Sequence, residues 1–218
     1  MEPEHDDEDR EFLRRYGPWE RHTPASAATL FVGFPAPWWI AGGWAIQALS
    51  GVERGHDDVD VAIFRRDIPA LRSHFAGRFD LWAVGSGMLR PLDDKRPALP
   101  RWAVQVWMRE QALAPWQLDI VLTPGTRRQW IFRLDQSITR TFDQAVWTGD
   151  DGLRYLRPEL ALAFKARLRR GKDDRDLDAA LPRLDDQARD WLAAYVHKAH
   201  PDHPWNHILY PSPPVSES

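Results

Sequence analysis

The stretch that decides the fold is residues 42–67, which read GGWAIQALSGVERGHDDVDVAIFRRD. A short apolar run, residues 38–41, comes directly before the two glycines, and this pattern predicts a strand that ends in a tight turn. Residues 44–49 predict a short helix, which a serine and a glycine end. Residues 58–64 alternate in polarity and predict a second strand. The predicted order is therefore strand, glycine turn, helix, loop and strand.

Two carboxylates lie on one face of the second predicted strand. Asp58 and Asp60 are two residues apart, and Val59, Val61 and Ile63 form the opposite, apolar face. Carboxylates at this spacing on a strand point the same way and can bind a hard cation between them. Taken alone, such a pair is more typical of a solvated strand end.

A third aspartate changes the balance. Residues 116–122 read WQLDIVL, which predicts a strand with four apolar side chains on one face and Asp119 on the other. An aspartate inside an apolar strand is costly unless it is paired or binds a cation. Two interpretations stand equally: an ion pair with an arginine such as Arg133, or a metal site shared with Asp58 and Asp60.

Gly42-Gly43 stands at the start of the helix predicted over residues 44–49 and is a candidate phosphate site. Backbone N–H groups at a helix start bind phosphate, and glycine lets the phosphate approach closely. The pair alone is more typical of a tight turn, because neither the P-loop nor the dinucleotide-binding pattern is present. Lys165 lies at the border of the apolar face of a helix predicted over 158–168. Phosphate contact and a solvated basic face are both open for it.

Composition excludes several classes of protein. The 218 residues contain no cysteine, which excludes disulfides, cysteine-ligated zinc, iron–sulfur clusters and thiol catalysis. The histidines over residues 197–207 straddle two prolines and lack a metal-binding spacing, so we expect any metal site to use oxygen ligands. A net charge of −3 makes a nucleic-acid partner unlikely. No apolar run approaches the ~20 residues of a membrane span, and the acidic start of the chain is no signal peptide. We expect a cytoplasmic protein without a membrane partner; nothing in the sequence predicts its oligomeric state.

Changes in pattern along the chain predict four segments. They are an acidic N-terminal segment (1–22), a mixed α/β domain (23–150), a C-terminal helical part (151–206) and a proline-rich tail (207–218). Further helices are predicted near 24–32, 67–75, 173–181 and 185–197, further strands near 79–84, 102–108 and 129–133, and a loop over 86–100. Most of the 12 tryptophans are expected to serve the core, but six cluster near the candidate site and are candidates to line its cleft: Trp38, Trp39, Trp44, Trp102, Trp107 and Trp116.

Taken together, these motifs resemble the nucleotidyltransferase superfamily, whose signature is a Gly-Gly helix start followed by a strand with two aspartates. Gly42-Gly43-Trp44 and the run 56–60, HDDVD, are most similar to the aminoglycoside 2″-adenylyltransferase-like and lincosamide nucleotidyltransferase-like group. The resemblance extends over residues 25–206. One departure is Gln47, which stands where the close aminoglycoside enzymes have an acidic residue.

The resemblance implies a DNA polymerase beta-like nucleotidyltransferase fold of the α/β (α+β) class, with a mixed, mostly antiparallel sheet and a small C-terminal helical part. It implies transfer of a nucleoside monophosphate, AMP from ATP, to a hydroxyl of a small polar acceptor such as an aminoglycoside or lincosamide, with release of pyrophosphate. The site residues it implies are Gly42, Gly43, Trp44 and Lys165 for the nucleotide, and Asp58, Asp60 and Asp119 for two Mg²⁺ ions, with Asp119 also able to take the acceptor's proton. The alternatives are a toxin–antitoxin-type enzyme that modifies protein or tRNA, and a non-catalytic nucleotide-binding protein.

Overall fold

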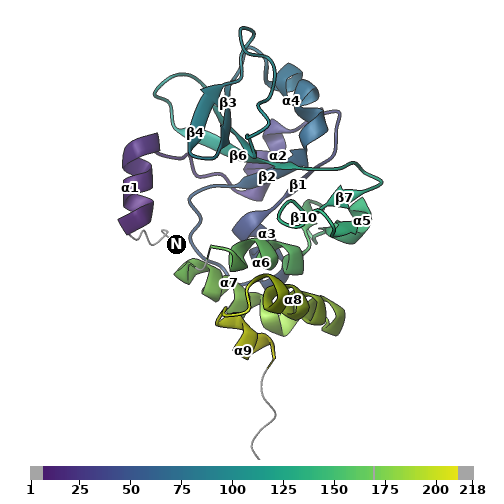
Figure 1. The fold of residues 1–218 in the computed structure, drawn as a ribbon. Helices are drawn as coiled ribbons and strands as arrows, with labels where there is room; N and C mark the ends of the chain where they lie inside the picture. The colour runs from purple at the N-terminus through teal and green to yellow at the C-terminus, as the bar shows by residue number, and fades with distance from the viewer. Residues whose placement is uncertain (1–6, 169, 211–218) are drawn as a thin grey trace, which may run out of the picture.

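The computed structural model describes residues 7–168 and 170–210, which are built around an eight-stranded mixed sheet (Figure 1). The strand order is β4-β3-β5-β6-β2-β1-β10-β9. The strands are β1 (Trp38–Ile40), β2 (Asp60–Phe64), β3 (Asp80–Gly85), β4 (Met88–Pro91), β5 (Gln105–Arg109), β6 (Trp116–Thr123), β9 (Val146–Thr148) and β10 (Arg154–Leu156). The β2–β6 and β1–β10 pairs are parallel and the other neighbours are antiparallel. This is the mixed, mostly antiparallel sheet that the sequence predicted. A separate pair joins β7 (Trp130–Ile131) to β8 (Thr139–Arg140).

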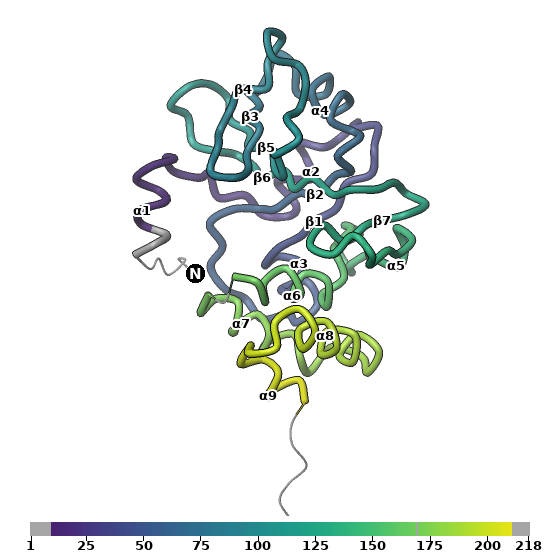
Figure 2. Tube along the Cα trace, in the orientation of Figure 1, coloured from purple at the N-terminus to yellow at the C-terminus, as the bar shows by residue number. Residues whose placement is uncertain are grey.

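Helices α6, α7, α8 and α9 gather with α3 at one end of the sheet, and α1 lies at the flank of the sheet (Figures 1 and 2). The α-helices are α1 (Asp7–Tyr16), α2 (Pro24–Leu30), α3 (Gly42–Ser50), α4 (Ile68–Phe75), α5 (Phe142–Ala145), α6 (Pro158–Ala166), α7 (Gly171–Ala180), α8 (Asp186–Ala199) and α9 (Trp205–Leu209). Short 3₁₀ turns, η1 (Arg65–Asp67) and η2 (Leu181–Arg183), precede α4 and follow α7. Among the described residues, no helix combines the length and the apolar character that crossing a bilayer would need.

The two parallel strands β2 and β6 hold the centre of the sheet because one face of each is apolar. Val61 and Ile63 of β2 and Leu118 and Ile120 of β6 are fully buried. Burial of such a side chain contributes about 1.5–3 kcal/mol. This core fixes the register of the pair, in which Asp60 lies directly beside Asp119. Because neighbours in register share a face of the sheet, the two carboxylates are brought together by the pairing.

The starts of the helix predicted over 44–49 and of the strand predicted over 58–64 were each wrong by two residues. β2 begins at Asp60 rather than at residue 58, and α3 begins at Gly42 rather than at residue 44. Asp58 lies just before the strand, where its carbonyl oxygen accepts a hydrogen bond of 3.0 Å from the indole N–H of Trp44. That bond to a side chain of α3 replaces a strand pairing, so Asp58 extends from a loop.

The predicted loop over 86–100 was also wrong in part, because it contains β4. Ser86 and Gly87 both have positive φ angles, of 51° and 70°, between β3 and β4. Two such residues make the tight turn that matches the twist of a hairpin. The strand predicted at 102–108 begins at Gln105, and the one predicted at 129–133 is reduced to Trp130–Ile131.

The predicted acidic N-terminal segment contains α1, and α1 and the residues that follow it are fixed to β5 and β6. The backbone oxygen of Tyr16 accepts a hydrogen bond of 2.7 Å from the indole of Trp116. The ring of Trp107 lies 5.6 Å from those of Phe12 and Tyr16 and 5.2 Å from that of Trp19. Edge-to-face contacts of this kind are worth about 0.5–1.5 kcal/mol each. Residues 1–6 of the segment lie outside the described residues.

The predicted boundary near residue 150 falls within the sheet. β9 ends before it and β10 begins after it, and the two strands pair with each other. β10 also lies parallel to β1, with Tyr155 beside Ile40. The division into a domain of 23–150 and a helical part of 151–206 stays a prediction. Of the predicted tail, residues 211–218 lie outside the described residues.

Candidate active site

Three aspartates meet at one point of the sheet. Asp60 and Asp119 lie on the neighbouring strands β2 and β6, and Asp58 reaches the same place from the loop before β2. Each offers a carboxylate oxygen, and these three atoms lie within 4.8 Å of one another. The structure therefore brings together the three residues that the sequence analysis selected.

Burial raises the pKa of all three carboxyl groups, and neighbouring carboxylates raise those of Asp58 and Asp119 further. Burial, together with the charge of Asp60, raises the pKa of Asp58 to about 7. Burial also raises the pKa of Asp60, and burial with the charges of Asp60 and Asp58 raises that of Asp119 well above its usual value. Like charges in a buried site are unfavourable unless a cation offsets them.

The surroundings of Asp119 fit a cation ligand. Its Oδ2 accepts a hydrogen bond from the side-chain amide of Gln105, while its buried Oδ1 accepts none from the described residues. Nor does it form the ion pair with Arg133 that the sequence left open: that guanidinium lies 5.6 Å from the centre of the Phe164 ring. An unsatisfied buried oxygen among three carboxylates is the donor set that divalent cations of the Mg²⁺ type prefer.

The start of α3 lies against these carboxylates. Gly42 has a φ of 61°, and a Cβ atom there would overlap Oδ2 of Asp60. The N-cap residue, Ala41, makes no side-chain hydrogen bond to the first turn. The helix start therefore presents backbone donors beside the aspartates, and only glycine allows this approach.

Trp44 and Gln47 of α3 hold the loop that leads to Asp58. The ring of Trp44 stacks on His56 with centroids 4.2 Å apart, in addition to its bond to Asp58. Gln47 Oε1 lies 2.9 Å from Nε2 of His56 and 3.4 Å from the backbone nitrogen of Arg54. Gln47, which departs from the resembled pattern, thus fixes the loop. Burial and the charge of Arg54 lower the pKa of His56 to about 3.

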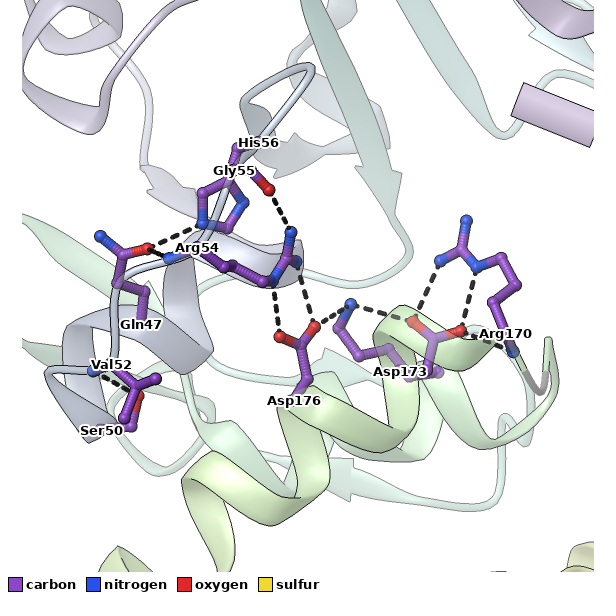
Figure 3. Close-up of polar contacts among 10 residues, drawn as sticks. Gln47, Ser50, Val52, Arg54, Gly55, His56, Arg170, Asp173 and Asp176 are labelled. Atoms are coloured by element: carbon purple, nitrogen blue, oxygen red, sulfur yellow. Dashed lines mark hydrogen bonds and ion pairs between the residues drawn. The ribbon is translucent and has the colours of Figure 1, made fainter. Parts of the chain in front are cut away.

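Lys165 lies inside a chain of ion pairs that joins three parts of the fold (Figure 3). Its Nζ is 2.7 Å from Oδ2 of Asp176 and 3.2 Å from Oδ1 of Asp173, both on α7. Asp176 also pairs with Arg54 from the α3–β2 loop, and Asp173 pairs with Arg170. Lys165 is 6% exposed. The solvated basic face that the sequence left open for Lys165 is therefore wrong.

One cavity of about 730 Å³ contains the aspartates, the start of α3 and part of this ion-pair chain. Its volume lies within the range of small-molecule sites. Trp39 and Trp44 line it, as expected. The residues that line it do not include Trp38, Trp102, Trp107 and Trp116. Trp107 and Trp116 instead pack with each other and with Trp19 of the N-terminal segment.

Sequence reasoning missed Arg54 and Gln105 and gave Asp176 no role. Arg54 stands in a loop, where periodicity says nothing about side-chain direction. Its pairing with Asp176 joins residues that are 122 positions apart. The one available signal was the spacing of Asp173 and Asp176, which puts two acidic side chains on one face of a helix beside Lys165.

Comparison with known proteins agrees with this geometry. Residues 26–78, which include the glycines, Asp58 and Asp60, match the family model of aminoglycoside-2″-adenylyltransferase. No curated protein matches the chain.

Three solved structures are similar over most of their length. The solution structure of the antibiotic-resistance factor ANT(2″)-Ia has a TM-score of 0.50 at 14% identity and covers 84% of this chain and 94% of its own. Its crystal structure in complex with adenylyl-2″-tobramycin gives 0.52 at 13%, with 79% and 94% covered. Lincomycin-bound lincosamide antibiotic adenylyltransferase LnuA gives 0.50 at 13%, with 74% and 98% covered. The nucleotidyltransferase fold that the sequence predicted is confirmed. The predicted resemblance to the aminoglycoside and lincosamide adenylyltransferase group is confirmed by the family model and by these similar structures.

Proposed function

We propose that this protein is a divalent-cation-dependent adenylyltransferase that moves AMP from ATP to a hydroxyl group of a small polar acceptor and releases pyrophosphate. An antibiotic of the aminoglycoside or lincosamide class is the proposed acceptor. The observation that carries the proposal is the meeting of Asp58, Asp60 and Asp119 beside the glycine start of α3 in one cavity. The similar structures of two antibiotic adenylyltransferases support it.

The three aspartates would hold two Mg²⁺ ions. Such ions supply charge stabilisation to the attacking and leaving oxygens of an in-line displacement at phosphorus. Gln105 orients Asp119 by donating to its Oδ2, and Oδ1 accepts no hydrogen bond from the described residues. Asp119 would accept the proton of the acceptor hydroxyl, since its Oδ1 accepts no hydrogen bond from the described residues.

The nucleotide would bind across the start of α3. The backbone N–H groups of Gly42 and Gly43 would donate to phosphate oxygens, in the half of the cavity that Lys165 and its partners line. Trp44 holds Asp58 in place through its indole N–H and presents one edge of the cavity. These parts would bind and orient the two reactants.

The test measures pyrophosphate release with Mg²⁺ and each nucleoside triphosphate, with and without a panel that includes tobramycin and lincomycin. We expect release to depend on the acceptor and to stop when EDTA is added. Asp58→Asn and Asp60→Asn should each lower turnover by more than about 100-fold, because each removes a charged ligand. Without metal, neither variant should melt at a lower temperature than the wild type, because each relieves carboxylate repulsion.

The matched control is Asp80→Asn, which removes an exposed carboxylate of β3 outside the cavity and should leave turnover unchanged. Full activity in either site variant would show that the assignment of the aspartates is wrong. Labelling of protein or tRNA instead of the antibiotics would favour the toxin–antitoxin type of enzyme. Nucleotide binding without pyrophosphate release would favour a non-catalytic protein.

A further inference from the structure

Arg54 lies over the start of α3 and keeps part of its hydrogen-bonding capacity. Its Nε donates to Asp176 Oδ1 at 2.7 Å, its Nη2 donates to Asp176 Oδ2 at 3.1 Å, and its Nη1 donates to the Gly55 carbonyl at 2.8 Å (Figure 3). A guanidinium has five N–H groups, so two remain after these bonds to the described residues. A Cβ atom at Gly43 would overlap Arg54 Nη2. The guanidinium is therefore in contact with the first turn of α3.

Lys165 is in a different electrostatic position, although it lines the same cavity. Only 7% of its side chain is exposed, compared with 22% for Arg54. Two carboxylates flank its ammonium, at 2.7 Å and 3.2 Å. These two carboxylates offset the charge of Lys165 at short range, whereas Arg54 pairs with one carboxylate, Asp176, which it shares with Lys165. Lys165 is thus suited to holding Asp176 rather than to binding an incoming anion.

Asp176 connects these two cations. Its Oδ1 and Oδ2 accept both bonds of the Arg54 fork, and Oδ2 also pairs with Lys165. The side chain is 4% exposed, so its position is fixed by packing as well as by charge. A bidentate pair sets both the position and the plane of a guanidinium, which a single contact does not.

We propose that Arg54, rather than Lys165, is the cation that contacts the phosphates of the nucleotide, and that Asp176 and Lys165 are positioning residues that hold its guanidinium over Gly43. This inference rests on the proposed function, because it assigns a role within the same nucleotide site. The two remaining N–H groups of Arg54 and the backbone donors of the α3 start then converge on one phosphate chain.

The experiment measures binding of inorganic tripolyphosphate and of AMP by isothermal titration calorimetry in the presence of Mg²⁺. Arg54→Ala should weaken tripolyphosphate binding by about 10- to 100-fold, the size of one or two lost charge-assisted hydrogen bonds. It should change AMP binding by less than about threefold. Arg54→Lys should recover little, because an ammonium cannot bind Asp176 in a fork and the phosphate at once. Arg72→Ala, which removes an arginine paired with Asp94 outside the cavity, is the matched control and should bind as the wild type does.

Asp176→Asn separates positioning from simple charge. The substitution removes a negative charge from the cavity, so charge alone would strengthen the binding of an anion. The proposal predicts the opposite: weaker tripolyphosphate binding, a higher KM for ATP with a smaller change in the KM for the acceptor, and partial rescue by Asp176→Glu.

Thermal unfolding of each variant identifies any that fail to fold. If Arg54→Ala does not fold, the tripolyphosphate affinity of Arg54→Lys, the mildest change, tests the proposal instead. The proposal is overturned if Arg54→Lys binds tripolyphosphate as tightly as the wild type, if Asp176→Asn binds it more tightly, or if Lys165→Met loses more affinity than Arg54→Ala. If the wild type binds ATP and Arg54→Ala binds tripolyphosphate as tightly as the wild type does, this inference is wrong and the proposed function stands. A wild type that binds neither ATP nor tripolyphosphate defeats the proposed function as well.

Discussion

Trp44 is a residue whose side chain acts on two neighbours at once. Its indole N–H fixes the backbone of Asp58, and its ring covers one face of His56. Tryptophan suits this place because it combines a large flat surface with one directed donor. The ring also borders the cavity, so a charged ligand that enters the cavity changes the electric field around it.

We predict that ATP binding changes the intrinsic fluorescence of the protein and that Trp44→Phe removes a large part of the change. Phenylalanine keeps the stacking on His56 but cannot donate to the carbonyl of Asp58. The measurement is a fluorescence titration with ATP. Trp147→Phe, which replaces an indole of β9 outside the cavity, is the control and should respond as the wild type does. An equal response in both variants would place the nucleotide away from α3.

Several residues of the candidate site could be predicted from the sequence one at a time. Asp58 and Asp60 were identified by their spacing on one strand face, and Asp119 because a carboxylate in an apolar strand needs a partner. The pairing of β2 with β6 brings Asp60 and Asp119 together. Arg54 was not identified, since its role depends on an ion pair with a residue 122 positions away. Local pattern carries information on periodicity and caps, and none on which distant side chain a loop residue meets.

At the scale of elements, α7 is attached to α6 by charge. Asp173 is completely buried near the start of α7, where it pairs with Arg170 and with Lys165 of α6. Burial would raise the pKa of Asp173, but hydrogen bonds from Arg170 and the charge of Lys165 outweigh it and hold the pKa below the usual value. A carboxylate of this kind stabilises the folded state only while it is ionised.

We predict that Asp173→Asn lowers the free energy of unfolding at pH 7 by about 1–3 kcal/mol, because Lys165 loses one of its two carboxylate partners and keeps the other, Asp176. The folded-state pKa is depressed, so the contribution is complete above the ordinary pKa of aspartate and is lost as the pH falls through the lower, folded-state pKa. The difference between wild type and variant should therefore shrink in acid. Urea unfolding at several pH values measures it.

Asp178→Asn, on the exposed side of the same helix, is the control for that experiment and should cost less than about 0.5 kcal/mol. A difference that stays constant from pH 7 to acid would mean that Asp173 acts through packing rather than through charge.

Element positions were predicted better than element ends. The Gly-Gly start and the apolar alternation located α3 and β2, but a side-chain bond from Trp44 keeps Asp58 out of the strand. β4 was missed because residues 88–91 show no alternation, and the turn at Ser86 and Gly87 with its pairing to β3 makes them a strand. Pairing partners of this kind override local propensity.

At the scale of the whole molecule, the chain on both sides of residue 150 builds one sheet and one cavity. β10 lies beside β1, and Lys165 and Asp176 from the later part face Arg54 from the earlier part. The change from strand to helix patterning near residue 150 was visible in the sequence. The return of the chain to the sheet was not, because strand β10 is only three residues long.

This arrangement predicts that residues 23–150 do not fold alone and that the full chain unfolds in one cooperative transition. Loss of β10 would leave the edge of β1 unpaired, and loss of α6 and α7 would leave Arg54 without its buried carboxylate. Far-ultraviolet circular dichroism and tryptophan fluorescence, followed through urea unfolding of the full chain, should then give the same midpoint. Two separated midpoints, or a folded fragment of residues 23–150, would contradict the prediction, because either result requires the first part to be stable without β10, Lys165 and Asp176.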